Sequence, residues 1–206
     1  MFITFEGGEG SGKSTQSQLL AQTLQEEGCD VILTREPGGT SGAESIRKLV
    51  LTGNEDRWAP VTEALLYLAA RADHWYRIIK PSLDAGKIVI SDRFQDSSVV
   101  YQGLCKGVSV DFLNRIYQYI TSGIFPDRTY LLSVSPEIGV KRSISRKNNE
   151  ETRFENMYID FHKSVFQNFL KIAEENSRFL VVDGNRDINV VAKEIYEDFC
   201  LFLAKR

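Results

Sequence analysis

Short apolar runs alternate along this chain with longer stretches in which apolar residues recur every three or four positions. Continuous apolar runs are typical of strands buried on both faces, and the longer spacing is typical of amphipathic helices. Strands are expected at Phe2–Phe5, Val31–Leu33, Ile88–Ile90, Tyr130–Val134 and Phe179–Val182. Helices are expected after Gly12 and near 42–51, 61–79, 109–121, 136–146 and 187–204. The alternation predicts an α/β fold whose mainly parallel central sheet is flanked by helices.

Length and composition favour a single globular domain, 1–206. The 206 residues are 42% hydrophobic and 26% charged, and no repeat or Pro/Gly-rich linker divides them. A net charge of −3 provides no global basic field to gather a nucleic acid polymer. The three cysteines lie far apart without metal-ligand spacing, which argues against a disulfide framework or a zinc site. No signal peptide is evident and no apolar run approaches the roughly 20 residues of a membrane span, so a cytoplasmic location is expected.

The first predicted strand leads into a glycine-rich loop, Gly7-Gly8-Glu9-Gly10-Ser11-Gly12-Lys13-Ser14. It fits the phosphate-binding pattern G-x-x-x-x-G-K-[ST], in which backbone amides and a helix N-terminus converge on phosphate oxygens. Lys13 is expected to reach the β- and γ-phosphates, and Ser14 to bind Mg²⁺. The loop indicates that a nucleoside triphosphate binds, but GTPases, motor ATPases and small-molecule kinases all use it.

Two further groups of residues follow predicted strands, at the edge of a parallel sheet where ligands bind. Asp92 could hold Mg²⁺ and Arg93 could bind a phosphate, with a structural salt bridge as the alternative. The turn sequence Arg35-Glu36-Pro37-Gly38-Gly39 brings an arginine to the same edge, although it could also be a plain strand-to-helix turn.

Tyr67 and Arg71 lie four positions apart and therefore share one face of the helix expected near 61–79. A ring beside a guanidinium can hold a planar base, the first by stacking and the second by hydrogen bonding. The alternative is an amphipathic core helix with a surface arginine.

Other residues are expected to serve packing. His74 and His162 lie far apart and pair with no nucleophile, so surface or half-buried roles are expected for them. Aromatic residues near helical spacing are expected to form the core face of a long helix: Phe154, Tyr158, Phe161, Phe166 and Phe169.

In order and content, these motifs resemble those of bacterial thymidylate kinases. The matching segments are Gly7–Ser14, Arg35–Gly39, Tyr67–Arg71, Asp92-Arg93 and Ser97–Gly103. The combination of Arg-Glu-Pro-Gly-Gly with Asp-Arg and Tyr-Gln-Gly is highly specific to that family. The resemblance implies a P-loop nucleoside-monophosphate-kinase fold with a parallel five-stranded sheet and a short lid. It also implies phosphorylation of deoxythymidine monophosphate (dTMP) to dTDP with ATP and Mg²⁺, in dTTP biosynthesis, by a homodimer.

The resemblance further implies roles for residues around the acceptor. Tyr67 takes the position of an aromatic residue, commonly phenylalanine, that stacks on thymine. Tyr101 takes that of a tyrosine that crowds the 2′ position of the sugar and favours deoxyribose. Contacts to the base edge are implied for Arg71, Ser98 and Gln102. The sugar 3′-hydroxyl and the acceptor phosphate are implied to lie near Glu9, Arg35, Glu36, Pro37, Arg47 and Arg93.

A polar segment at about 141–154 is interpreted as the lid, with a solvated helix end and loop as the alternative. The phosphate loop itself contains no arginine, whereas the lid offers Arg142, Arg146 and Arg153. This resembles the bacterial arrangement, in which lid arginines act on the transferring phosphoryl group. Arg142 is expected at the ATP site. The expected catalytic residues are Lys13, Arg93, Arg146 and Arg153.

Two alternatives remain. A kinase of another nucleoside, deoxynucleoside or monophosphate would use the same loop, although arginines near the acceptor favour a bound phosphate. A GTP-dependent switch would need a guanine-reading Asn-Lys-x-Asp sequence after a strand, and the chain has none.

Overall fold

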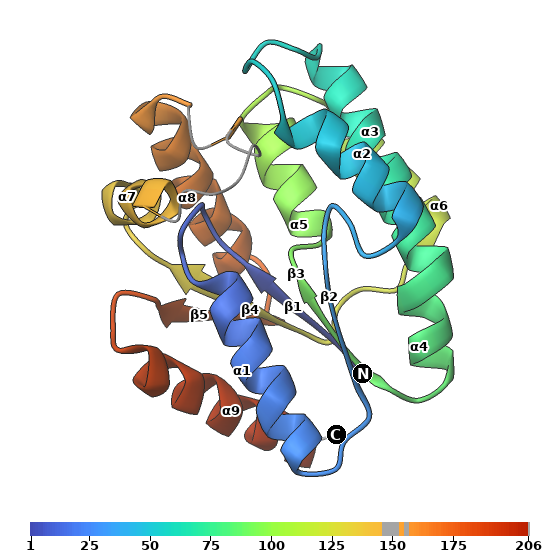
Figure 1. Ribbon diagram of the computed structural model, residues 1–206, viewed down its shortest axis with the longest axis vertical. Coiled ribbons are helices and arrows are strands. Elements are labelled where there is room, and N and C mark those ends of the chain that lie inside the picture. The colour runs from blue at the N-terminus through green and yellow to red at the C-terminus, as the bar shows by residue number, and fades with distance from the viewer. Residues whose placement is uncertain (146–152, 155–156, 206) are drawn as a thin grey trace.

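The computed structural model describes residues 1–145, 153–154 and 157–205, and it contains one five-stranded sheet with the strand order β2-β3-β1-β4-β5 (Figure 1). All neighbouring strands run parallel, which confirms the predicted fold class. The strands are β1 (Phe2–Glu6), β2 (Val31–Arg35), β3 (Ile88–Asp92), β4 (Arg128–Ser133) and β5 (Phe179–Asp183). Each overlaps the apolar run from which it was predicted.

Helices connect the strands and cover both faces of the sheet. Those before β3 are α1 (Lys13–Glu26), α2 (Ser41–Leu51), α3 (Pro60–His74), the π-helical turn η1 (Trp75–Ile79) and α4 (Lys80–Asp84). Between β3 and β4 lie α5 (Gln95–Ser98), the π-helical turn η2 (Val99–Leu104) and α6 (Val110–Thr121). The last three are α7 (Pro136–Ser145), α8 (Ile159–Glu174) and α9 (Ile188–Ala204). No helix of the described chain is long and apolar enough to cross a membrane.

The alternation of side chains along β1 divides the core between the two faces of the sheet. Ile3 and Phe5 pack with α1 and α9, which lie side by side over one face (Figure 1). Phe2 points to the opposite face and packs with residues of α3, η1 and α6. A third cluster joins η2 and α8 to β4 through Leu131. Both faces of the sheet are therefore covered by apolar packing.

Side-chain caps fix where several helices begin. The hydroxyl of Thr40 accepts a hydrogen bond from the amide of Ala43, 3.0 Å away, at the start of α2. Asp187 caps α9 in the same way. The predicted aromatic helix face was wrong at its N-terminal end, because α8 begins only at Ile159. Phe154 lies before the helix, and Tyr158 is 83% exposed.

Candidate active site

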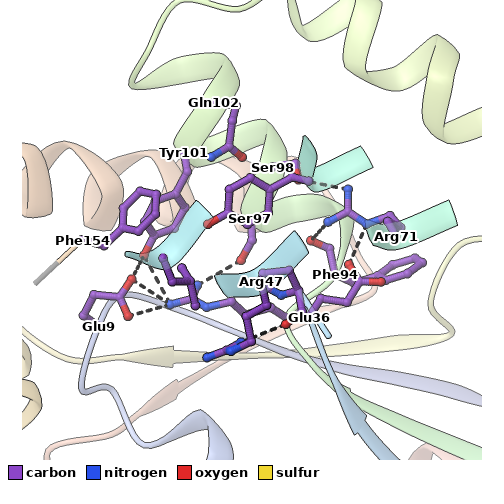
Figure 2. Close-up of a pocket in the computed structure, with 14 residues that line it drawn as sticks. Glu9, Glu36, Arg47, Arg71, Phe94, Ser97, Ser98, Tyr101, Gln102 and Phe154 are labelled. Carbon is purple, nitrogen blue, oxygen red and sulfur yellow. Dashed lines mark hydrogen bonds and ion pairs between the residues drawn. The ribbon is translucent and has the colours of Figure 1, made fainter. Parts of the chain in front are cut away.

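The carboxyl ends of β1, β2 and β3 meet at one edge of the sheet, since Phe5 and Arg35 are both in register with Asp92. The loops that leave these ends carry the predicted motifs. They border a pocket lined by Glu9, Glu36, Pro37, Arg47, Leu51, Tyr67, Arg71, Arg93, Phe94, Ser97, Ser98, Tyr101, Gln102 and Phe154 (Figure 2). The structure therefore brings together all but one of the residues predicted to bind the acceptor.

The phosphate loop is compact because its glycines adopt conformations that other residues avoid. Gly10 and Gly12 have φ angles of 65° and 97°. A Cβ on Gly10 would lie 1.9 Å from the carbonyl oxygen of Gly139 in α7, so only glycine fits at this contact. Lys13 folds back over the loop and donates to the carbonyls of Gly7 and Gly8 at 3.0 and 2.6 Å. Its ammonium is thus held at the centre of the loop.

The charge on Lys13 is sensitive to its surroundings. Burial and the nearby Arg93 lower its pKa to about 8, while Glu9 acts in the opposite direction. At neutral pH the ammonium form still predominates. A phosphate bound against the loop would add negative charge and favour that form further.

Glu9, Arg93 and Tyr101 form a cluster in the pocket, and Figure 2 shows Glu9 and Tyr101 at the same end of it. Arg93 donates to both carboxylate oxygens of Glu9 at 3.0 Å, and the Tyr101 hydroxyl donates to Glu9 at 2.9 Å. Burial would raise the pKa of Glu9, but Arg93, Lys13 and the Tyr101 hydroxyl outweigh it and hold that pKa at about 2. Glu9 is therefore a carboxylate throughout the physiological range.

Arg93 has a positive φ angle of 70°, which is unfavourable for a residue with a long side chain. Its amide donates to the carbonyl of Phe5 at 2.9 Å, and its guanidinium donates to the Gly7 carbonyl and the Ser97 hydroxyl, both at 3.0 Å. These bonds compensate the strain. Strain of this kind is found at functional sites, where the surrounding structure holds one conformation.

A buried cluster forms the other end of the pocket. Arg71, which is 2% exposed, donates to Glu36 at 2.7 Å and to the Ser98 hydroxyl at 3.0 Å. His74 contacts the second oxygen of Glu36 at 3.0 Å and the Thr34 hydroxyl at 2.7 Å. Burial opposes ionisation of Glu36, yet Arg71 and His74 lower its pKa. The cluster fixes the guanidinium of Arg71 before any ligand arrives.

The side chains of Ser14 and Asp92 fit a cation site. The Ser14 hydroxyl donates to one carboxylate oxygen of Asp92 at 2.5 Å, and the other oxygen is buried without a hydrogen-bond partner among the described residues. No cluster of three or more His, Cys, Asp or Glu side chains suited to a metal occurs in the described part of the chain. Mg²⁺ commonly uses few protein ligands and completes its shell with water and phosphate oxygens, so this donor pair suits it.

A second cavity borders the phosphate loop. Its wall includes Gly12, Gln16, Arg142, Gly184 and Ile188. Arg142 crosses from α7 to donate to the carbonyl of Gly184 at 3.1 Å. The structure thus places Arg142 beside the phosphate loop, in a cavity that shares no lining residue with the pocket around Arg93.

Of three further predicted arginines, the structure describes two, and neither lines this pocket. Arg35 does not line the pocket; it pairs with Glu44 at 3.1 Å and its side chain is 53% exposed. Arg153 is 2% exposed and donates to backbone carbonyls that include those of Val50 and Asn54. Its predicted catalytic role stays a prediction. Arg146 lies outside the described residues.

Several residues of the site escaped sequence reasoning. His74 and His162 were expected in surface or half-buried packing roles, and the expected degree of burial was wrong, because they are 0% and 4% exposed. For His74 the spacing of three from Arg71 was the available signal, since it places both side chains on one helical face. Phe154, assigned to a helix core, instead lines the pocket, with its ring centroid 5.6 Å from that of Tyr101.

Glu6 and Glu63 were also missed. Both carboxylates are 0% exposed. Glu6 accepts from the amide of Phe94 and the hydroxyl of Ser97, so it holds the loop that carries Arg93. An isolated glutamate in an apolar segment has no spacing to a second polar residue that would indicate a role in the site.

Comparison with known proteins agrees with this geometry over nearly the whole chain. Residues 5–195 match the family described as thymidylate kinase. The chain is 48% identical to a thymidylate kinase of Ruegeria pomeroyi over 198 residues, covering 96% of this chain and 93% of that protein. It is 43% identical to one of Magnetococcus marinus, covering 96% and 94%. The crystal structure of an Ehrlichia chaffeensis thymidylate kinase superposes with a TM-score of 0.79 at 34% identity, covering 97% of this chain and 98% of that one. The chain therefore belongs to the thymidylate kinase family.

Proposed function

We propose that this chain transfers the γ-phosphoryl group of ATP to dTMP and releases dTDP and ADP. The observation that carries the proposal is the position of Glu9. It belongs to the phosphate loop and also lines the acceptor pocket, where Arg93 and Tyr101 bind it. A single loop thus borders both the donor phosphates and the acceptor. Membership in the thymidylate kinase family supports dTMP as that acceptor.

The acceptor would lie along the pocket with its base toward Arg71 and its phosphate toward Arg93. Arg71, Ser98 and Gln102 supply hydrogen-bonding groups for the base edge, and Tyr67 supplies a ring for its face. Arg47 and Arg93 offer positive charge at the phosphate end. Arg35 would join them by leaving Glu44, an exchange that costs little because this exposed ion pair is weak.

The donor would place its phosphates against the amides of the phosphate loop and its nucleoside in the cavity beside Arg142. Ser14 and Asp92 would hold Mg²⁺. When bound, the ion would neutralise charge on the β- and γ-phosphate oxygens.

The protein groups act by position and charge. The acceptor phosphate oxygen is already ionised, so the reaction needs no strong base. Lys13 supplies a positive charge at the loop, and Arg93 supplies another at the acceptor phosphate. Both are held by hydrogen bonds before the substrates arrive, which limits reorganisation during transfer. Arg146 is proposed to add charge from the lid. Arg153 would do so only by leaving Glu63 and the backbone carbonyls that it binds here.

We also propose that the protein works as a cytoplasmic homodimer. The adjoining helices α3 and α6 carry exposed apolar side chains that a partner could cover, among them Leu65, which is 48% exposed, and Tyr119, which is 83% exposed. Sedimentation equilibrium tests the proposal, and a monomer at micromolar concentration would refute it.

A panel of acceptors with ATP and Mg²⁺ tests the function. We expect dTMP to give the highest kcat/KM, ahead of dUMP, UMP, dCMP and unphosphorylated thymidine. GTP in place of ATP tests the switch alternative. Lys13→Ala should reduce turnover by about 100-fold or more, because charge-stabilising groups are worth several kcal/mol. A preference for thymidine over dTMP would indicate a nucleoside kinase, and near-normal turnover in folded Lys13→Ala would exclude the loop from the mechanism.

A further inference from the structure

Glu63 lies in the first turn of α3, completely buried, and three side chains contact it. Gln102 donates its amide to Oε1 at 2.9 Å, and Lys106 donates to both carboxylate oxygens at 2.8 Å. Arg153 pairs with Oε2 at 2.6 Å. A buried ion cluster of this kind adds little net stability compared with apolar residues, so its presence calls for another explanation.

The cluster determines which way the Gln102 amide faces. A carboxylate accepts hydrogen bonds and cannot donate them, so the NH₂ group of Gln102 must face Glu63. Burial would raise the pKa of Glu63, but Lys106, Gln102 and Arg153 lower it, so Glu63 stays a carboxylate. The Gln102 oxygen is left without a hydrogen-bond partner among the described residues, and the side chain is turned toward the pocket (Figure 2).

Arg71 supplies the complementary group in the same pocket. Four of its five N–H groups are already used, by Glu36, Gln95, Ser98 and the carbonyl of Phe94. One N–H on Nη2 therefore remains for a ligand. Besides the Ser98 hydroxyl, which accepts from Arg71 and can still donate, the polar groups left for a base edge are a fixed donor on Arg71 and a fixed acceptor on Gln102.

This pair distinguishes pyrimidines by their hydrogen-bonding edges. Thymine and uracil present the O4 acceptor beside the N3–H donor, which match Arg71 and Gln102. Cytosine presents an amino donor beside an N3 acceptor, the reverse order. A freely rotating Gln102 amide could turn over and satisfy the cytosine N3.

We propose that Glu63 is a positioning residue that holds the Gln102 amide in one orientation and thereby sets the preference for thymine or uracil over cytosine. Glu63 acts through Gln102 and does not touch the substrate. The proposal rests on the acceptor site described under the proposed function.

The variant Glu63→Gln tests this directly, because glutamine offers Gln102 either a donor or an acceptor at nearly unchanged volume. We expect the ratio of kcat/KM for dTMP to that for dCMP to fall about 10- to 100-fold, the size expected for one buried hydrogen bond. The ratio is measured within one preparation, so a reduced folded fraction cancels. An unchanged ratio in the folded variant would overturn the proposal.

A double-mutant cycle separates positioning from a general loss of structure. In the Gln102→Ala background, Glu63→Gln should change the ratio less than twofold, because the group that it positions is absent. A fall as large as in the parent would show that Glu63 acts by another route. Lys106→Met is the matched control. It removes a charge from the same cluster but leaves Glu63 to accept from Gln102, so the ratio of kcat/KM for dTMP to that for dCMP should stay unchanged.

Amide NMR of the parent protein covers the case in which Glu63→Gln does not fold. The side-chain NH₂ signal of Gln102, assigned by its absence in Gln102→Ala, should show one proton with exchange slowed relative to exposed glutamines. Free exchange of both protons would overturn the proposal. Failure of the proposed function is distinguishable, since it would appear as absent dTMP turnover in the parent.

Discussion

Tyr101 illustrates how one side chain joins the phosphate loop to the acceptor pocket. Its hydroxyl donates to Glu9, and its ring packs edge-on against Phe154, Phe161 and Phe169. The ring is only 5% exposed, so its position is fixed by packing before the substrate binds. A ribose 2′-hydroxyl placed against it would lose its hydration without gaining a partner.

Sugar selection should therefore depend on the bulk of the Tyr101 ring. In the parent, kcat/KM for dUMP should exceed that for UMP by about tenfold or more, since burying an unpaired hydroxyl costs about 1–3 kcal/mol. Tyr101→Phe should keep most of this ratio and Tyr101→Ala should reduce it. The ratio of dTMP to dUMP is the control and should change little in either variant. If Tyr101→Ala leaves the dUMP-to-UMP ratio unchanged, sugar selection lies elsewhere.

At the scale of elements, the C-terminus of α2 depends on a residue far away in the sequence. The last carbonyls of a helix lack intrahelical partners. Arg153 donates to the Val50 carbonyl at 3.0 Å and its own amide donates to that of Leu51 at 3.3 Å. It also pairs with Glu63 in α3. Arg153 thus ties the end of α2 to α3, beside the pocket.

Arg153→Ala should lower the free energy of unfolding by about 3–5 kcal/mol, because it removes one partner of a buried ion pair. Arg153→Lys should lower it less, since the charge remains but the planar fork of donors is lost. Urea unfolding measures both. If Arg153 is catalytic instead, Arg153→Ala should reduce kcat and leave the free energy of unfolding unchanged. That result would contradict the capping role.

At the scale of the whole molecule, the buried carboxyl of Glu6 makes global stability depend on pH. Burial, followed by repulsion from Asp96, raises its pKa from the ordinary 4.5 to about 7. Between these values the folded protein holds a proton that the unfolded chain has released. The contribution of Glu6 to the free energy of unfolding is therefore fully present below pH 4.5 and is lost as the pH rises toward 7.

Glu6→Gln should remove this part of the pH dependence, because glutamine does not titrate. The free energy of unfolding of the parent, relative to the variant, should fall by up to about 1.4 kcal/mol per pH unit across that window. Urea titrations at a series of pH values measure the difference. Parallel profiles for the two proteins would show that Glu6 titrates normally in the fold.

The sequence by itself determined the features that depend on near neighbours in the chain. The apolar runs located the strands of the sheet, because a strand buried on both faces needs continuous apolar residues. The phosphate loop could be identified from the sequence because glycine, lysine and serine must follow one another at set spacing to surround a phosphate. The parallel order of the strands then allowed Arg93 to be placed at the same sheet edge as the loop.

Only the tertiary structure decided which distant residues meet. Arg153 and Glu63 are 90 positions apart, and Gln102 and Glu63 are 39 apart, so no local pattern relates them. Buried charges are stable only when a partner is present, and that partner is chosen by how α3, η2 and the 153–154 segment pack. The sequence could therefore indicate which residues line the pocket, whereas the groups that hold those residues in place emerged only from the fold.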